Sequence, residues 1–256
     1  MNLQDYLNRR REREAQSAQF RKLCLTCRQP SFSCYCEHIK PFDSKIKFVI
    51  LIHPIEVRRR IATGRMAHLC LENSEIIRGL DYTNDYRVNE ILNNPQNECV
   101  VLYPGRNSIN LTAPESVDSP KLNQNSAPAI KHQVFSPDKT PVVFVIDGTW
   151  ATSRKMIRLS KNINTLKRIC FTPITPSNFR VRKQPKPNCL STIEAIFFTI
   201  NLLADQVGFD LESGLQSNLT TVFDKMVERQ IEFIKQSRQN LRSRSYRSGR
   251  TPHIEI

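Results

Sequence analysis

Four cysteines stand close together near the start of the chain. The segment from Cys24 to Cys36 reads CLTCRQPSFSCYC and holds four of the eight cysteines. Thiolates spaced C-x2-C fit two adjacent corners of a zinc tetrahedron, and Cys34 and Cys36 can supply the other two after a turn. Four reduced cysteines in a loop are the alternative. With Cys24, Cys27, Cys34 and Cys36 as ligands, the coordination sphere would be closed and the zinc structural.

A second chemical signal is an aspartate at the end of an apolar run. Asp147 directly follows VVFVI and precedes Gly148, Thr149 and Trp150. Ligand sites in open α/β sheets form beyond the carboxyl ends of strands, where a glycine permits close approach to the backbone. The tetrad therefore predicts a ligand site. The structural alternative makes Thr149 a helix N-cap, leaves Asp147 solvated in a turn and packs Trp150 in the core.

The elements that must position these residues alternate between strands and helices. Continuous apolar runs predict buried strands over residues 47–53, 98–103, 142–147 and 167–172. Apolar periodicity predicts helices after Thr63 and over residues 150–159, 190–204 and 219–234. Ser191 and Glu194 have the spacing of a capping box at the start of the third helix. This alternation predicts an α/β fold with a mostly parallel sheet flanked by helices.

Composition divides the chain into three parts. Residues 1–44 are expected to form an N-terminal helix and the cysteine module, and residues 45–236 the main domain. Within that domain, residues 106–141 are rich in Ser, Pro, Asn and Lys and lack periodicity, which predicts a flexible insertion. Residues 237–256 form a basic tail that could contact phosphates or simply be solvated.

The charge of the chain favours a polyanionic partner. It has 256 residues, with 38 Lys and Arg against 24 Asp and Glu, for a net charge of +14. We expect nucleic acid rather than a membrane, because no basic amphipathic helix with apolar aromatics opens or closes the chain. No apolar run approaches the roughly 18 to 20 residues of a membrane span. No secretory signal is evident, which predicts a reducing cytoplasmic location without disulfides.

Several common chemistries are excluded by their missing motifs. The glycines never form G-x-G, and no pair of them makes a P-loop. G-x-S-x-G and H-E-x-x-H are also absent, so neither a serine hydrolase nor a zincin is indicated.

The tetrad DGTW resembles the signature of the DTW-domain family. Further matching segments are CLTCRQPSFSCYC, HPIE from His53, YPG at Tyr103 and RVRKQPKPNCLSTIEA from Arg180, so the resemblance covers most of the chain. It implies a tRNA-uridine aminocarboxypropyltransferase, which moves the 3-amino-3-carboxypropyl group of S-adenosylmethionine to N3 of uridine. It also implies a SPOUT-like, knotted fold. One departure is Ala62 before Thr63 and Gly64, where the family pattern has Asn-Thr-Gly.

The resemblance also assigns roles to residues. Asp147, Thr149 and Trp150 would be catalytic, with Asp147 either the base that takes the N3 proton or the partner of a cation on the cofactor. Burial would raise the pKa of Asp147 from about 3.9 toward the useful range. The residues implied to bind S-adenosylmethionine are Thr63, Leu102, Tyr103, Pro104, Gly148, Pro173, Asn188, Leu190, Ser191 and Thr192. Those expected to contact tRNA are Arg154, Lys155, Arg180, Arg182, Lys183 and Lys186.

Two other functions remain open at this stage. An RNA methyltransferase could use the same cofactor site, because fold does not decide which carbon is presented. A non-enzymatic, zinc-containing RNA-binding protein is the second alternative. The sequence indicates no obligate protein partner, and it leaves open the oligomeric state, the tRNAs chosen and the uridine modified, for which the family expectation is the variable loop.

Overall fold

The computed structural model describes residues 23–57, 59, 61–105, 107–112, 133–182 and 189–241, with isolated positions 4, 5 and 8. Side chains are described as far as Lys235. Most of the predicted N-terminal helix therefore lies outside the described residues. Among the helices of these ranges, none combines the length and the apolar character needed to cross a membrane.

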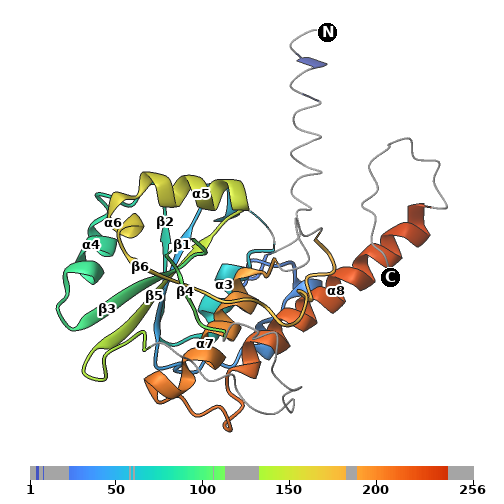
Figure 1. Ribbon diagram of the computed structural model, residues 1–256. Helices are drawn as coiled ribbons and strands as arrows, with labels where there is room; N and C mark the ends of the chain where they lie inside the picture. Colours follow the sequence, from blue (N-terminus) through green and yellow to red (C-terminus); the bar gives the residue numbers. More distant parts are fainter. Residues whose placement is uncertain are drawn as a thin grey trace.

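A parallel six-stranded sheet forms the centre of the fold (Figure 1). Its order is β2-β1-β5-β3-β6-β4, and every neighbouring pair is parallel. The strands are β1 Lys47–Ile52, β2 Ser74–Arg78, β3 Asn97–Leu102, β4 Ile109–Asn110, β5 Thr140–Asp147 and β6 Lys167–Cys170. The α/β prediction is confirmed, including all four predicted strands. Edge strands β2 and β4 were not predicted, because β2 is only half-buried and β4 has two residues.

Alternating side chains of the central strand explain why helices cover both faces of the sheet. Val143 and Val145 belong to one buried cluster, and Val142 and Phe144 belong to another on the opposite face. The first cluster is completed by α3 Thr63–Cys70, α7 Thr192–Val207 and α8 Ser217–Leu241. The second is completed by α4 Tyr86–Asn93, α5 Trp150–Leu159 and α6 Lys161–Asn164. Whether the chain is threaded as a knot stays a prediction.

Parts of the segment predicted as a flexible insertion belong to the sheet and the core. Within residues 106–141, Leu111, Val134 and Phe135 are buried in the core, and β4 and the start of β5 belong to the sheet. These apolar residues are too widely spaced to produce a periodic pattern, so the Ser- and Pro-rich composition masked them. Residues 113–132 lie outside the described part of the chain.

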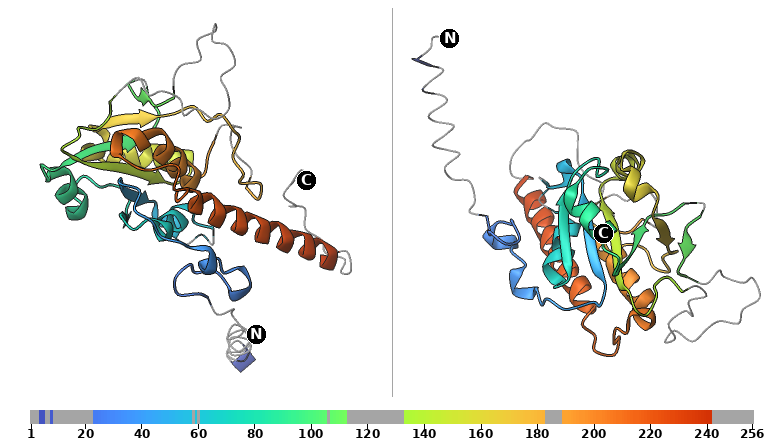
Figure 2. Two further views of the ribbon diagram at one scale, coloured as in Figure 1. Left: turned by 90° about the horizontal axis from the view of Figure 1, so that it is seen from below. Right: turned by 90° about the vertical axis from the view of Figure 1, so that its left-hand side faces the viewer.

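A long last helix and the N-terminal cysteine module lie together. In two views α8 extends well beyond the sheet (Figures 1 and 2), and it contacts the short helices η1 Ser31–Ser33 and η2 Cys36–His38. Helix α8 continues to Leu241, so the first residues of the predicted basic tail are helical. Residues 242–256 are outside the described part.

Candidate active site

Asp147 is the last residue of β5, a strand paired with β1 on one side and β3 on the other. The backbone N–H of His53, just beyond β1, donates to the Asp147 carbonyl at 3.0 Å. The Asp147 side chain is buried, with 6% exposure. The prediction of a strand-end position is confirmed, and the alternative of an aspartate solvated in a turn is wrong because α3 and α7 close over it.

The two oxygens of the Asp147 carboxylate differ in their surroundings. Oδ1 accepts a hydrogen bond from the Thr192 hydroxyl at 2.7 Å, at the start of α7. Oδ2 is buried and has no hydrogen-bond partner among the described residues. It lies against Gly64, where an added Cβ would come within 2.5 Å of it. A buried polar atom without a partner is costly in a folded protein, so Oδ2 is the atom of this site that is suited to a ligand.

Burial raises the pKa of Asp147 above its ordinary value of 3.8. The hydroxyl of Thr192, the charge of Arg182 and the nearby backbone N–H of Gly64 oppose that rise in the pKa, whereas the charge of Glu56 adds to it. A carboxyl group with a raised pKa is a better proton acceptor than an exposed aspartate. The location of Asp147 therefore suits acid–base chemistry.

Two adjoining cavities lie at this end of the sheet, and the Asp147 carboxylate lines one of them. The first, which we call the acidic cavity, measures about 160 Å³ and contains Asp147 in its wall. It is lined by Glu56, Thr63, Asp147, Gly148, Thr149, Trp150, Phe179, Arg182, Cys189, Leu190, Ser191 and Thr192. The second, the apolar cavity, measures about 200 Å³ and lies over the ends of β3, β5 and β6. Gly148, Trp150, Leu190, Ser191 and Thr192 line both, so the two cavities adjoin.

The residues predicted to bind the cofactor gather around these two cavities. The apolar cavity is lined by Leu102, Tyr103, Pro104, Gly148, Pro173, Leu190, Ser191 and Thr192. Thr63 lines the acidic cavity instead, at the start of α3. Asn188 lies outside the described residues. The fold thus brings the described members of this set to one place.

Thr149 and Trp150 begin helix α5. The Thr149 hydroxyl accepts from the Thr152 N–H at 3.2 Å, so Thr149 is the N-cap that the structural alternative expected. Trp150 is 45% exposed, which excludes it as core filler. Its indole N–H donates to the Cys189 sulfur at 3.2 Å. This contact holds the ring in the wall that both cavities share.

The loop that follows β6 is fastened to α7 by Glu194. One Glu194 oxygen accepts from the Ser191 backbone N–H at 2.8 Å, which confirms the predicted capping box, and from the Ser177 hydroxyl at 2.7 Å. The other accepts from the Asn178 N–H at 2.8 Å, and the Asn178 amide also donates to Asp224 of α8 at 2.5 Å. These bonds place Phe179 and Arg182 against the acidic cavity.

The basic residues predicted to contact RNA fall into two groups. Arg154 and Lys155 lie on the exposed side of α5, where with Ala151 and Arg158 they line a shallow groove. Arg180 and Arg182 are both exposed, in the loop beside the acidic cavity, and Arg182 lines that cavity. Lys183 and Lys186 lie outside the described residues.

The four cysteines of the N-terminal module form a compact cluster. Their sulfurs all lie within 4.8 Å of one another, with Cys24 to Cys36 and Cys27 to Cys34 both at 3.6 Å. None of the four is in a disulfide. Zinc–sulfur bonds of about 2.3 Å in a tetrahedron separate the sulfurs by roughly 3.8 Å. Backbone N–H groups of Cys27 and Thr26 lower the pKa of Cys24 to about 6, whereas burial raises the pKa of Cys27 and of Cys36 in the metal-free cluster. The cluster could therefore hold a metal ion.

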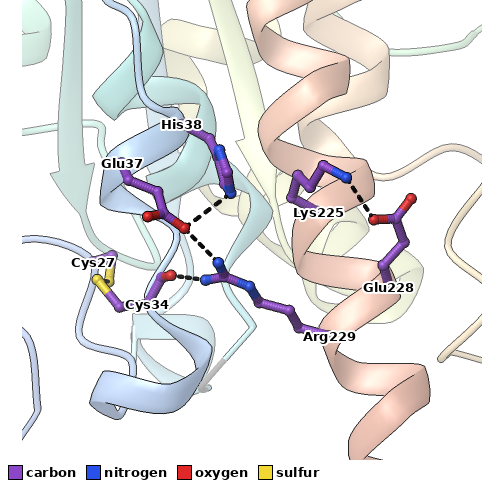
Figure 3. A network of polar contacts seen from close by, with 7 residues as sticks. All are labelled: Cys27, Cys34, Glu37, His38, Lys225, Glu228 and Arg229. Carbon is purple, nitrogen blue, oxygen red and sulfur yellow. Dashed lines mark hydrogen bonds and ion pairs between the residues drawn. The ribbon is translucent and has the colours of Figure 1, made fainter.

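One arginine of α8 fastens the module to the domain (Figure 3). The Arg229 guanidinium donates to the carbonyl oxygen of Cys34 and to the Glu37 carboxylate, the latter at 2.5 Å. The rings of Phe32 and Phe233 stack beside it, with centroids 4.6 Å apart. The cysteine module is thus packed on α8, on the same helix that holds Asn178.

Sequence reasoning missed two residues that shape the site. Glu56 in α2, Pro54–Val57, is 5% exposed and lines the acidic cavity. Gly64 leaves the room that the Asp147 carboxylate occupies. Both belong to segments singled out for their resemblance, HPIE and Ala62–Gly64, but the sequence contains no signal that these segments face Asp147.

The fold and site define an α/β domain with two adjoining cavities at the carboxyl end of its central parallel strand. The profile of the DTW domain family matches residues 21–231, and the chain belongs to that family. No solved structure matches the chain.

Curated relatives share the name tRNA-uridine aminocarboxypropyltransferase 2. The protein from Drosophila melanogaster is 28% identical over 181 residues, covering 68% of this chain and 63% of the relative. The one from Mus musculus is 23% identical over 196 residues, covering 73% and 58%. That of Macaca fascicularis is 22% identical over 205 residues, covering 78% and 62%. The chain thus spans about three fifths of the length of these relatives.

Proposed function

We propose that this protein is a tRNA-uridine aminocarboxypropyltransferase that uses S-adenosylmethionine as donor and modifies N3 of a uridine. The observation that carries the proposal is the buried Asp147 carboxylate, with one oxygen that has no partner among the described residues, in the wall of the acidic cavity, which adjoins the apolar cavity. Membership of the DTW family and the names of the relatives support the same activity. On the strength of the resemblance, we place the target uridine in the variable loop.

The residues present fit the donor. The apolar cavity, with Leu102, Pro104 and Ile169 in its wall, suits the adenosine part. The start of α7 and Arg182 offer N–H groups to the carboxylate of the methionine part. When bound, the donor supplies a γ-carbon made electrophilic by its sulfonium leaving group, which departs as neutral methylthioadenosine.

Asp147 is the proposed proton acceptor. The N3 imide of uridine is protonated at neutral pH, so removing its proton as N3 attacks carbon lowers the barrier. The uridine N3–H proton passes to Oδ2 as the bond between N3 and the γ-carbon forms. The bond between that carbon and sulfur breaks, and its electron pair stays on sulfur. Thr192 holds Oδ1 and so fixes the direction in which Oδ2 faces. Trp150 and Thr149, at the start of α5, position the wall between donor and base.

The choice of the γ-carbon over the methyl carbon depends on orientation. The same sulfonium activates both carbons, and the aligned one reacts. The shared wall of Trp150, Leu190 and Thr192 would set this alignment.

We further propose that the cysteine module holds a structural zinc and that tRNA is bound through phosphate contacts. Arg154 and Lys155 of α5 and Arg180 and Arg182 beside the cavity are the described candidates. A cytoplasmic location agrees with reduced cysteines, none of which forms a disulfide in the described ranges.

A double-label assay tests the proposed reaction. Purified protein is given unmodified tRNA and S-adenosylmethionine labelled either in the methyl group or in the methionine carboxyl group. We expect only the carboxyl label in tRNA, and a loss of about 100-fold or more with Asp147→Asn, the scale of a missing general base. Methyl label in tRNA would make the protein a methyltransferase. If neither label reaches tRNA, an RNA-binding protein without this activity is favoured.

A further inference from the structure

The acidic cavity contains a second buried carboxylate that the proposed reaction does not use. Glu56 is 5% exposed and Asp147 is 6% exposed, and both line this cavity. Their charges interact, because Glu56 adds to the forces that raise the pKa of Asp147. Two buried carboxylates in one small cavity are costly unless positive charge compensates them.

Protein groups compensate this charge only in part. Arg59 forms an ion pair with one Glu56 oxygen at 3.0 Å, but its own side chain is 41% exposed and stands outside the cavity wall. Among the lining residues that the structure describes, Arg182 carries the one positive charge, against the two carboxylates of Glu56 and Asp147. With both acids ionised, the wall has a net charge of 1 − 2 = −1.

The donor complements this charge. Its methionine part has a positive sulfonium, a positive α-ammonium and a negative carboxylate, for a net charge of +1. A sulfonium has no N–H to donate, whereas an ammonium donates three hydrogen bonds and is best met by carboxylate oxygens. Oδ1 of Asp147 accepts from Thr192, and Oδ2 is the proposed acceptor of the uridine proton, so Glu56 is the carboxylate of the cavity left for the ammonium.

We infer that Glu56 binds the α-ammonium group of the donor and thereby selects a donor that carries an amino acid. This inference rests on the proposed function and deepens it. It also divides the work between the two acids, with Glu56 neutralising the cation and Asp147 free to accept a proton. Helix α2 follows β1 directly, so the short HPIE segment brings Glu56 to the same sheet edge as Asp147.

The test compares two stable probes by calorimetry with the full-length protein. One is S-adenosylhomocysteine, and the other is its desamino analogue, in which hydrogen replaces the α-amino group. We expect the wild type to bind S-adenosylhomocysteine at least tenfold more tightly. Glu56→Gln should reduce that preference to within about threefold while leaving the affinity for the desamino analogue unchanged, because only the ammonium contact is lost.

Two control variants separate this role from a structural one. Arg59→Gln breaks the ion pair with Glu56 but should keep the preference for S-adenosylhomocysteine over the desamino analogue. Glu90→Gln, which replaces an exposed carboxylate on α4, should keep it too. If Glu56→Gln weakens both probes equally, or if the wild type shows no preference, the inference is overturned. If the wild type binds neither probe, the proposed donor itself is wrong.

Discussion

The cysteine module and the strand-end site both gather polar groups, but they satisfy them differently. In the module, four sulfurs lie at mutual distances that one tetrahedral ion would complete, and Arg229 donates to the surrounding backbone and to Glu37. At the strand end, one oxygen of Asp147 has no partner in the described chain, and two carboxyl groups line the cavity with one arginine among its described lining residues. The first arrangement is closed and suits structure, whereas the second is open toward a ligand and suits chemistry.

The largest expected effect is on stability and comes from opening the module. We expect Cys24→Ser with Cys27→Ser to lose one bound zinc per chain and to lower the free energy of unfolding by about 4 kcal/mol or more, because the binding energy of a structural metal is folding energy. Metal analysis measures the zinc content, and chemical denaturation measures the free energy of unfolding. Cys99→Ser, at a half-buried cysteine of β3 outside the module, should keep the zinc. Unchanged metal content in the double variant would contradict a closed site.

Closing the strand-end site should mainly reduce activity. In Gly64→Ala the new Cβ would stand 2.5 Å from Asp147 Oδ2, so the carboxylate must move. We expect a loss of at least about tenfold in transfer rate, since a small misplacement of a catalytic group has a large cost. Zinc content should be unchanged. Full activity in this variant would show that the position of Oδ2 is not critical.

The raised pKa of Asp147 gives a stability effect with a definite sign. The folded protein holds this proton more tightly than the unfolded chain, so ionised Asp147 reduces stability as pH rises above the unfolded value of 3.8. Asp147→Asn should therefore be more stable than the wild type at pH 7, and the difference should shrink as pH falls toward 3.8 and below. Denaturation at several pH values tests this, while transfer by the wild type should rise with pH as Asp147 ionises.

A constant difference in stability across this pH range would contradict a carboxyl group with a raised pKa. A wild-type rate that falls as pH rises through the ionisation of Asp147 would count against its role as base.

The smallest expected effect concerns the contact between module and domain. Arg229→Gln should lower the free energy of unfolding by about 1 kcal/mol, because it removes partly exposed, charge-assisted hydrogen bonds. Lys225 lies one turn before Arg229 on α8 and forms an exposed ion pair with Glu228. Lys225→Gln should lower the free energy of unfolding by less than Arg229→Gln does. Equal effects in thermal denaturation would show that the Arg229 contact does not specifically fasten the module.

The sequence predicted those parts of the fold that local patterns encode. The strand ending at Asp147 is a continuous apolar run, and the capping box at Ser191 and Glu194 is a local hydrogen-bond pattern, so both were found. The short strand β4 was missed because it has only two residues, and Leu111, which follows it, is buried by distant parts of the chain. Burial of that kind leaves no periodic signal.

The candidate site was predicted in its chain order but not in its contacts. Asp147 and its position at a strand end follow from sequence. The unpartnered oxygen, the closeness of Gly64 and the second carboxylate Glu56 depend on how α2 and α3 pack beside β5, which no local pattern reveals. The resemblance to the DTW-domain family pointed to the segments that contain Glu56 and Gly64. Only the fold shows that these segments lie beside Asp147.

Helix α8 gives the molecule a fixed internal spacing. Asp224 holds the loop of the acidic cavity and Arg229 holds the cysteine module, and five residues of helix separate them by about 7.5 Å along the axis. A helix keeps the spacing of its residues, so these two contacts tie the module and the loop to fixed points on one element. A large ligand that contacts both the cysteine module and the loop of the acidic cavity would therefore have to match a spacing that one helix sets.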